Sequence, residues 1–501
     1  MPTSPALSPA AAWEPLPAAE WNADAARHLF RRAGWTALKA DVEQAEREGL
    51  AATLDRLFPA EPVLFPEPIQ VARFAEQVAD YAGREKAAAT PEERRLIQRE
   101  RREQAQTAVQ DMSLRWLSFA AQPANAAYAK WVLFLSDVYV VGFDKVQNPP
   151  FIFGHFDVLG RYGLGPAPVL AKAVSRSPAM MVYLDLNQNR REAPNENFAR
   201  ELFELFLLGE GNYTEQDIKE AARAFTGYRL RPLTGEVFIA PNQHDAGPKT
   251  IFGQTGNFTG DDVIDLAYDL PAAGAFLPHE LVKFYLSDTM LPPEYLLALG
   301  DRWRTEGSLE LRWLARQFFG SRIFYAPEFR GDFIKSPVQL YLGLVQDLAL
   351  DVVPVPRLVL NPLRQMGQTL YTPPNVRGWV GGRAWINSAS LAARRTLVEL
   401  LFNPIDENKL NADEQLDLAA AHTQGADRFT VTDRTLQELE RIAPSTFIAR
   451  LETNLLPVTA EDAFSTGLAR FIGGANTPPE RLRRIRRAVM TLLQSPEYQL
   501  C

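Results

Sequence analysis

Cysteine is almost absent from this chain of 501 residues, and its one cysteine, Cys501, is the last residue. An internal disulfide and a zinc site made of several thiolates are therefore excluded. Histidine is also scarce, so a metal site with three imidazole ligands would have to be assembled from distant segments. The five histidines are His28, His155, His244, His279 and His422.

Long apolar runs are missing as well. The most apolar stretch, Trp131–Phe143, contains Ser136 and Asp137 and is shorter than the roughly 20 residues that a membrane-spanning helix needs. The first basic residue is Arg27, so the positively charged start of a secretory signal is not present. We expect a cytoplasmic location without a membrane span, and export together with a signal-bearing partner is the alternative.

Neither sign of charge dominates the composition. The 53 basic and 61 acidic residues give a net charge of −8, so we do not expect a dedicated nucleic-acid binder. The content of 46% hydrophobic and 23% charged residues is typical of a soluble globular chain and excludes a disordered or fibrous protein. Neither a phosphate-cradling GxxxxGK[ST] loop nor a GxSxG nucleophile elbow occurs in the sequence.

Helical periodicity dominates what is present. Thr90-Pro91-Glu92-Glu93 is a capping box that opens a charged helix reaching to about Gln106. Proline-rich residues 59–68 and 351–356 predict extended connectors. The fold class we predict is mainly α, a large multi-helix domain with a small β-hairpin insertion. The predicted parts are an N-terminal helical segment (1–58), a connector and charged helix (59–111), a main helical body (112–401) and a C-terminal helical segment (402–501).

Residues 228–240 interrupt the helical pattern. Thr234-Gly235 lies between two short alternating runs, and this arrangement predicts a β-hairpin. The following residues, Gln243–Gly260, are rich in glycine and predict a loop. A loop of that length in a compact domain is usually either functional or mobile.

Residues 194–209 predict a helix inside the protein, because phenylalanine and leucine cover most of its circumference and the polar residues form one stripe. An unpaired buried carboxylate costs on the order of several kcal/mol, so the stripe must face a cavity, a polar element or a partner. One interpretation is an internal network in which Arg200 pairs with Glu204. The other is a catalytic or ligand-binding carboxylate pair. The candidate residues are Glu201 and Glu204 for catalysis, and Asn195, Glu196, Asn197 and Arg200 for binding.

A second cluster follows the predicted hairpin. His244, Asp245 and Lys249 place an imidazole, a carboxylate and an ammonium group within six residues. Such a cluster could coordinate a metal, hold a phosphate or transfer protons. The alternative is an Asx-type turn with a surface lysine. We take His244 and Asp245 as candidate catalytic residues and Lys249 as a candidate binding residue.

Arginine and tryptophan gather a third time near residue 380. The pattern predicts a stacking corner, suited either to packing or to holding a sugar or an aromatic ligand. The candidate binding residues there are Arg377, Trp379, Trp385 and Asn387.

These motifs resemble a bacterial family, domain of unknown function 1800. The resemblance covers nearly the whole chain, and the motifs follow one another in the same order as in that family. They are Ala26–Gly34, Ser177–Met180, Pro194–Leu202, Tyr213-Thr214, Ala222–Gly227, His244–Lys249, Lys335–Pro337, Pro373–Asn387 and Ser495–Gln499. The family is described without an established activity.

The resemblance also exposes a difference. Members of that family often carry Trp-His-Asn-His-Phe on an apolar helix and a histidine two residues after the second glutamate of the central helix. The corresponding positions here are Leu135–Tyr139 and Phe206, so three imidazoles are absent. Imidazole and carboxylate ligands would suit a divalent metal such as zinc, iron or manganese. Without those imidazoles, a carboxylate-dominated magnesium or manganese site, or no metal, is the better expectation.

Two functions remain open, one implied by the resemblance and one by the candidate residues. The first is a non-catalytic interaction or maturation partner of a co-encoded protein of the domain of unknown function 1501 family, which is similar to alkaline phosphatases and sulfatases. The missing histidines favour it. The second is a metal-assisted or carboxylate-based hydrolase acting on an anionic or carbohydrate substrate. An enzyme would require the four candidate catalytic residues to converge on one pocket.

Overall fold

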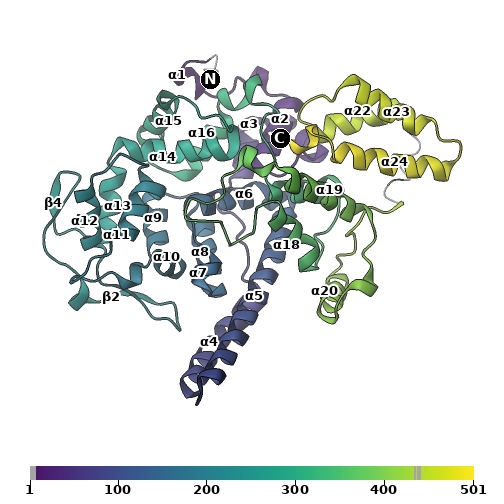
Figure 1. The fold of residues 1–501 in the computed structure, drawn as a ribbon. Helices are drawn as coiled ribbons and strands as arrows, with labels where there is room; N and C mark the ends of the chain where they lie inside the picture. Colours follow the sequence, from purple (N-terminus) through teal and green to yellow (C-terminus); the bar gives the residue numbers. More distant parts are fainter. Residues whose placement is uncertain (1–6, 434–435, 437–441) are drawn as a thin grey trace.

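Helices dominate the structure. The computed structural model describes residues 7–433, 436 and 442–501 (Figure 1). The strands in these residues form two short antiparallel pairs. The predicted mainly α-helical class with a small β-hairpin insertion is therefore confirmed. Among the described helices, none combines the length and the apolar composition that a membrane span requires.

The first part of the chain forms three short helices and a long two-helix arm. These elements are α1 (Pro9–Ala12), α2 (Ala23–Ala33), α3 (Lys39–Leu57), α4 (Ile69–Ala87) and α5 (Pro91–Ala121). The proline-rich residues between α3 and α4 form an extended connector, as predicted. α4 and α5 pack against each other, and their shared end projects from the body (Figure 1).

The charged helix α5 is longer than its sequence pattern predicts. Its capping box forms as expected: the Glu93 N–H donates to Thr90 Oγ1 at 3.1 Å, and the Thr90 N–H donates to Glu93 Oε2 at 3.3 Å. The helix then continues to Ala121, because neither glycine nor proline interrupts it, and its second half buries residues such as Trp116. A boundary at residue 111 therefore lies inside one continuous helix.

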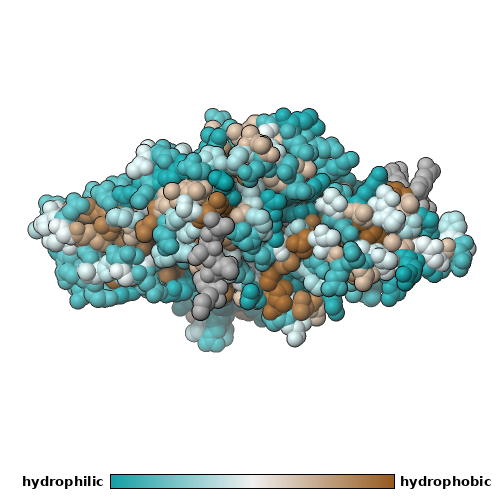
Figure 2. Space-filling model, turned by 90° about the horizontal axis from the view of Figure 1, so that it is seen from above, coloured by the Kyte–Doolittle hydropathy of each residue, from teal (hydrophilic) through white to brown (hydrophobic). Residues whose placement is uncertain are grey.

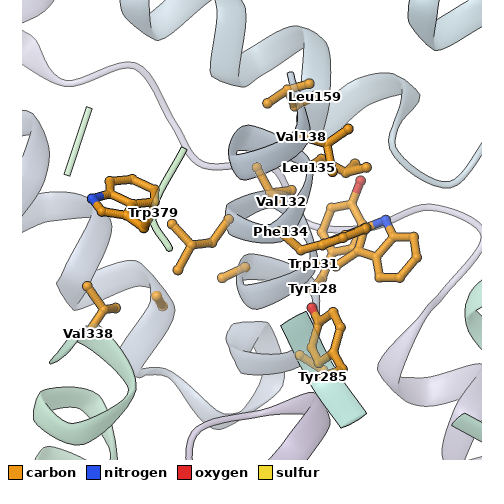
Figure 3. Packing of buried hydrophobic residues seen from close by; sticks show 14 of the residues in the cluster. Tyr128, Trp131, Val132, Phe134, Leu135, Val138, Leu159, Tyr285, Val338 and Trp379 are labelled. Carbon is orange, nitrogen blue, oxygen red and sulfur yellow. The ribbon is translucent and has the colours of Figure 1, made fainter. Parts of the chain in front are cut away.

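The helix α6 (Pro123–Val138) lies in the middle of the core, and nearly all of its side chains are buried. Trp131 packs against Phe134 and Tyr285, with ring centroids 5.2 and 6.4 Å apart. Figure 3 shows the side chains of α6 among residues of other elements, which include Leu159, Tyr285, Val338 and Trp379. Apolar protein surrounds α6. Its one carboxylate, Asp137, lies next to the C-terminal end of the helix.

The other helices of the body follow α6 in the chain, and α8 among them packs against α6, as do α2, α3 and α5. They are α7 (Phe143–Val146), α8 (Pro149–Tyr162), α9 (Ala167–Ser175), α10 (Pro178–Tyr183), α11 (Glu196–Glu201), α12 (Glu215–Ala224), α13 (Gly260–Tyr268), α14 (Pro271–Leu281), α15 (Pro293–Thr305), α16 (Leu311–Gly320), α17 (Pro337–Asp347), α18 (Pro356–Gln365) and α19 (Ser388–Phe402). Residues 351–355, between α17 and α18, form the predicted second connector.

The predicted hairpin is present. β1 (Tyr228–Leu230) pairs antiparallel with β2 (Val237–Ile239), and Arg229 lies opposite Phe238. The alternating pattern on both sides of Thr234-Gly235 thus predicted this element correctly.

The predicted loop over residues 243–260 is only partly a loop, because it contains a second hairpin. β3 (Lys249–Ile251) pairs antiparallel with β4 (Gln254–Gly256). The two residues between them, Phe252 and Gly253, have φ angles of 48° and 77°. Positive φ at both central residues is typical of a tight two-residue turn, so glycine here closes a hairpin.

The C-terminal helices follow α19, and the first of them lies apart from the others (Figure 1). They are α20 (Ala412–Thr423), α22 (Pro444–Leu455), α23 (Asp462–Gly473) and α24 (Pro478–Leu493). Arg31 of α2 donates from Nη2 to the carbonyl oxygens of Thr453 and Asn454 at 3.3 and 3.0 Å. This contact joins the end of α22 to the N-terminal part of the chain.

The surface seen in Figure 2 is largely hydrophilic, and hydrophobic residues occur on it in separate patches. The exposed apolar side chains belong to several elements, Leu96 of α5 and Phe471 of α23 among them.

Candidate functional site

Two π-helical turns border the candidate site. The helix predicted over residues 194–209 begins as α11, but its continuation, Leu202–Leu207, is π-helical. α14 contains Pro278 and continues in the same way, as a π-helical turn over Val282–Leu286. Such turns are rare and are frequent at functional sites. Both turns line one cavity, the first through Glu204 and the second through Lys283.

This cavity has a volume of about 570 Å³ and lies between the end of α6, the first π-helical turn, α14 and the residues just before Gly378. A cavity of this size admits a small molecule. A smaller space of about 40 Å³ continues past Asp137 toward Trp379 and Trp385. Charged or titratable side chains line the larger cavity together with apolar ones. They are Asp137, Glu204, Glu210, His279, Glu280, Lys283 and Arg377.

Asp137 lines both spaces and is held by the backbone of the 378–379 segment. Its Oδ1 accepts the N–H of Trp379 at 2.8 Å. Gly378 has a φ of 74°, and a Cβ at that position would collide with the Asp137 carboxyl group, so only glycine permits this close approach. Burial raises the pKa of Asp137 to about 7, and the Trp379 N–H and the charge of Lys283 oppose that rise. Oδ2 accepts no hydrogen bond from a described residue.

Glu280 lines the same two spaces in an opposite electrostatic setting. Its Oε1 lies 2.9 Å from His279 Nδ1, and its Oε2 accepts from Lys283 Nζ at 3.5 Å. Burial by itself would raise the pKa of Glu280, but the hydrogen bond with His279 and the positive charge and hydrogen bond of Lys283 outweigh burial and lower it. The cavity therefore holds one carboxyl group that keeps its proton to near neutral pH and one that is ionised.

Glu204 reaches the cavity from the first π-helical turn. Its Oε1 accepts from Arg377 Nη2 at 2.7 Å, and its Oε2 accepts from the Tyr213 hydroxyl at 2.9 Å. The same Arg377 nitrogen also donates to Glu210 at 2.9 Å. Glu201 is not among the described residues that line the cavity. Burial, with the charge of Glu204 adding to it, raises the pKa of Glu201.

The candidate binding residues at the start of α11 have structural partners. Asn195 is the N-cap, and its side chain accepts the N–H of Asn197 at 3.0 Å. The amide of Asn197 donates to the carbonyl oxygen of Leu184 at 3.2 Å. These two residues fix the beginning of the helix that carries Glu204 toward the cavity.

Arg200 does not pair with Glu204, and that expectation is wrong. Arg200 instead donates to both carboxylate oxygens of Glu215 at 2.8 and 2.7 Å, and to Glu196 at 3.4 Å. Glu215, at the start of α12, accepts from both terminal nitrogens of the guanidinium group. This bidentate pairing is stronger than a single hydrogen bond. Glu204 is thereby left to Arg377 and Tyr213.

The side chains of the turn at His244 form hydrogen bonds with neighbouring residues. His244 Nδ1 lies 2.8 Å from the carbonyl oxygen of Thr226. Asp245 accepts from Arg223 Nε at 2.7 Å. Neither His244 nor Asp245 is among the described residues that line either of the two spaces at Asp137. The structure therefore does not gather the four candidate catalytic residues in this cavity.

Lys249 belongs to the interior of the same turn. It is buried, and its Nζ donates to the carbonyl oxygens of Asp245 and Gly247 at 2.6 and 2.9 Å. Asp245 Oδ1 accepts the N–H of Gly247 at 2.9 Å, which is an Asx-type arrangement. The turn thus matches the alternative expected from sequence, except that its lysine is buried.

The predicted arginine and tryptophan corner forms the back of the site. Trp379 and Trp385 are buried and line the smaller space. Asn387 is the N-cap of α19, and its Oδ1 accepts the N–H of Ser390 at 2.9 Å. Of these four candidate residues, only Arg377 lines the larger cavity. The two indoles therefore support the wall behind Asp137.

Asp137, Glu280 and Lys283 of the cavity are not among the site residues predicted from the sequence. One carboxylate in an apolar helix, such as Asp137 in α6, is itself a signal of a buried site. Glu280 and Lys283 lie near Pro278, where a proline inside a helix marks an irregular turn. Their proximity to Asp137 arises only from the tertiary fold, so no local sequence pattern predicts it.

The residues at the three missing imidazole positions do not fit a resident metal. The Ser136 hydroxyl donates to the carbonyl oxygen of Leu133 at 2.7 Å. Val138 is apolar, and Phe206 packs against Tyr139 with ring centroids 6.0 Å apart. Within residues 7–433, 436 and 442–501, no three histidine, cysteine, aspartate or glutamate side chains are grouped so that they could hold a metal ion.

Comparison with known proteins gives one match. A family model described as a protein of unknown function, DUF1800, matches residues 28–500. No curated protein and no solved structure matches the chain. The matched residues include α6, both π-helical turns and the cavity between them. The chain therefore belongs to the DUF1800 family.

Proposed function

We propose that this protein is a carboxylate-based hydrolase whose active site is the cavity at Asp137. The observation that carries the proposal is the pair Asp137 and Glu280. Both carboxyl groups line one cavity, and their surroundings move the two pKa values in opposite directions. Two titratable groups with separated pKa values are the usual arrangement of a general acid and a general base.

In the proposed reaction Asp137 is the acid and Glu280 the base. The Glu280 carboxylate takes a proton from a water molecule as the water oxygen bonds to the electrophilic atom of the substrate. The bond from that atom to the leaving oxygen breaks, and the leaving oxygen takes the proton of Asp137. Proton exchange with solvent then restores both groups. Such proton transfers typically contribute about 10²–10⁴-fold to the rate.

The cavity wall can hold a small substrate that has both an anionic group and an apolar part. Lys283 and Arg377 are the cationic side chains, and 38% and 59% of their side-chain surface is exposed, so a bound anion can reach them. Phe276 and Leu296 line the same cavity and offer an apolar surface for the rest of the molecule.

A panel of 4-nitrophenyl substrates tests this proposal, with a phosphate monoester, a sulfate, a carboxylic ester and a glycoside as its members. We expect hydrolysis of at least one anionic member, with a rate that falls above about pH 7 as Asp137 loses its proton. Asp137→Asn should lower kcat by about 10²–10⁴-fold. Asp301→Asn, an exposed position on α15, is the matched control and should leave the rate unchanged. Inactivity toward the whole panel, or full activity of Asp137→Asn, contradicts the proposal.

A second candidate function is a non-catalytic interaction or maturation partner of the co-encoded DUF1501-family protein. The observation in its favour is the hairpin of β1 and β2, where Leu233, Phe238 and Ile239 are 54%, 38% and 42% exposed. Co-purification of the two proteins tests it, and Phe238→Ser should reduce the yield of the complex. A cytoplasmic location, with export alongside that partner as the alternative, is part of the proposal, and cell fractionation distinguishes the two.

A further inference from the structure

Another cavity, of about 430 Å³, lies between α2 and the turn after α22. It is built partly from the Ala26–Gly34 motif, which the hydrolase proposal leaves unexplained. The polar side chains in its wall come from three separate segments. They are Asp24, Arg27, His28 and Arg31 of α2, Arg330 before Gly331, and Glu452, Thr453 and Thr459 of the C-terminal helices.

Positive charge is only partly compensated in this cavity. Asp24 pairs with Arg27 at 2.7 Å, and Glu452 accepts a hydrogen bond from the Ser465 hydroxyl. Arg31 and Arg330, in contrast, donate only to backbone carbonyl oxygens, and neither forms an ion pair with a described residue. Arg31 is buried and Arg330 is exposed. A guanidinium group without a carboxylate hydrogen-bond partner favours a bound anion.

Arg31 has hydrogen-bonding capacity that the protein does not use. The residue is 5% exposed. Its Nη2 serves Thr453 and Asn454, whereas its Nε is buried without any partner in the described part of the chain. Nη1 likewise donates to none of the described residues. Nη1 can therefore donate to an anion bound in the cavity, whereas Nε is enclosed by protein atoms.

The pKa of His28 is affected by the same excess of positive charge. Its Nε2 lies 2.8 Å from the carbonyl oxygen of Phe324. Burial, followed by the charges of Arg32, Arg330 and Arg31, holds the pKa of His28 well below its usual value. The imidazole is therefore neutral at physiological pH, and the arginines supply the positive charge of the wall.

The opposite wall adds backbone donors. Gly331 has a φ of 67°, and a Cβ there would collide with the Val458 side chain, so the two segments approach each other closely. The N–H groups of Val458 and Thr459 donate to no carbonyl oxygen of a described residue. Backbone N–H groups that have no acceptor among the described residues can hold an oxyanion together with neighbouring guanidinium groups.

We infer that this cavity binds a phosphate-class oxyanion, either inorganic phosphate or the phosphoryl group of a small organic molecule, between Arg31, Arg330 and the 458–459 turn. The inference does not rest on the proposed hydrolase activity. A bound oxyanion would hold α2, Arg330 and the end of α22 together, because its oxygens accept from all three segments at once. Anion binding would then stabilise the docking of the C-terminal helices.

Isothermal titration calorimetry of the full chain tests the inference, with inorganic phosphate and phenyl phosphate as separate probes at constant ionic strength. We expect binding that Arg330→Gln and Arg31→Lys each weaken by about tenfold or more, since each removes charge-assisted hydrogen bonds. Arg483→Gln, an exposed position on α24, removes the same charge elsewhere and should leave the affinity within about twofold.

The two probes separate the two sources of the anion. Tighter binding of phenyl phosphate assigns the site to an organic phosphate, and equal or weaker binding assigns it to the free ion. Absence of heat with both probes, or equal affinity in all three variants, overturns the inference. Binding that Arg31→Lys and Arg330→Gln leave unchanged would belong to the Asp137 cavity instead, so these two variants separate this result from the hydrolase test.

Discussion

Replacing Asp137 by asparagine should stabilise the protein in a pH-dependent way. Burial keeps the folded-state pKa of this carboxyl group at about 7, whereas its ordinary value is 3.8. The folded protein therefore binds the proton more tightly than the unfolded chain. The resulting penalty is absent below pH 3.8, grows as the pH rises toward 7, and is complete above it. Asparagine keeps the Oδ1 acceptor for the Trp379 N–H and carries no charge.

The expected magnitude follows from the two pKa values. At about 1.4 kcal/mol for each tenfold change in proton affinity, a rise from 3.8 to about 7 costs the ionised folded state about 4 kcal/mol. At pH 5 the same two values give a penalty of about 2 kcal/mol. Asp137→Asn should thus raise the free energy of unfolding by about 4 kcal/mol at pH 8 and by roughly half of that at pH 5.

Urea denaturation at pH 5 and pH 8 measures both values, and the exposed Asp301→Asn serves as the control with no expected change. A stabilisation that is the same at both pH values would show that Asp137 is not a buried carboxyl group with a raised pKa. A destabilisation at pH 8 would refute the reasoning outright. Combined with loss of hydrolysis, a stabilised variant would be typical of an active site that gives up stability for function.

Three further predictions concern the surroundings of the site. Gly378→Ala should lower the free energy of unfolding by about 1–3 kcal/mol in urea denaturation, because φ is positive and the new Cβ meets Asp137; an unchanged midpoint contradicts this. Lys283→Gln removes a positive charge beside Glu280, so the pKa of Glu280 should rise and the acidic limb of the rate profile should move to higher pH; an unmoved limb excludes Glu280 as the base. His155, held neutral by burial with its pKa lowered from 6.5 to about 4, should cost the wild type about 3 kcal/mol of stability as the pH falls from 6.5 to 4. His155→Gln should remove that loss in the same denaturation series, and an equally steep acid loss in the variant speaks against it.

Local signals in the sequence predicted the elements well. The capping box at Thr90 and the hairpin around Thr234-Gly235 are confirmed, because each depends on a few neighbouring residues whose hydrogen bonds close locally. The helix over 194–209 was also correct as an interior helix with a polar stripe. Its π-helical continuation was not predicted, since no residue pattern distinguishes a π turn from an α turn there.

The composition of the site was harder to predict. Glu204 was found from its stripe, but its partner Arg377 comes from a distant segment, and Glu215 took the place expected for Glu204 beside Arg200. Asp137 and Glu280 come from two helices that meet only in the folded chain. The sequence shows that the residues of the His244 cluster are close along the chain, and this proximity suggested a catalytic site. It does not show that the cluster forms hydrogen bonds to Arg223 and Thr226.

The paired π-helical turns make the cavity dependent on chain length at two positions. An α-helix advances by about 100° per residue, so deleting one residue from Leu202–Leu207 would restore ordinary winding and swing the following side chains around the axis. The same holds for the turn at Val282–Leu286. Deletion of one residue from either turn would therefore remove the cavity and leave the other helices intact.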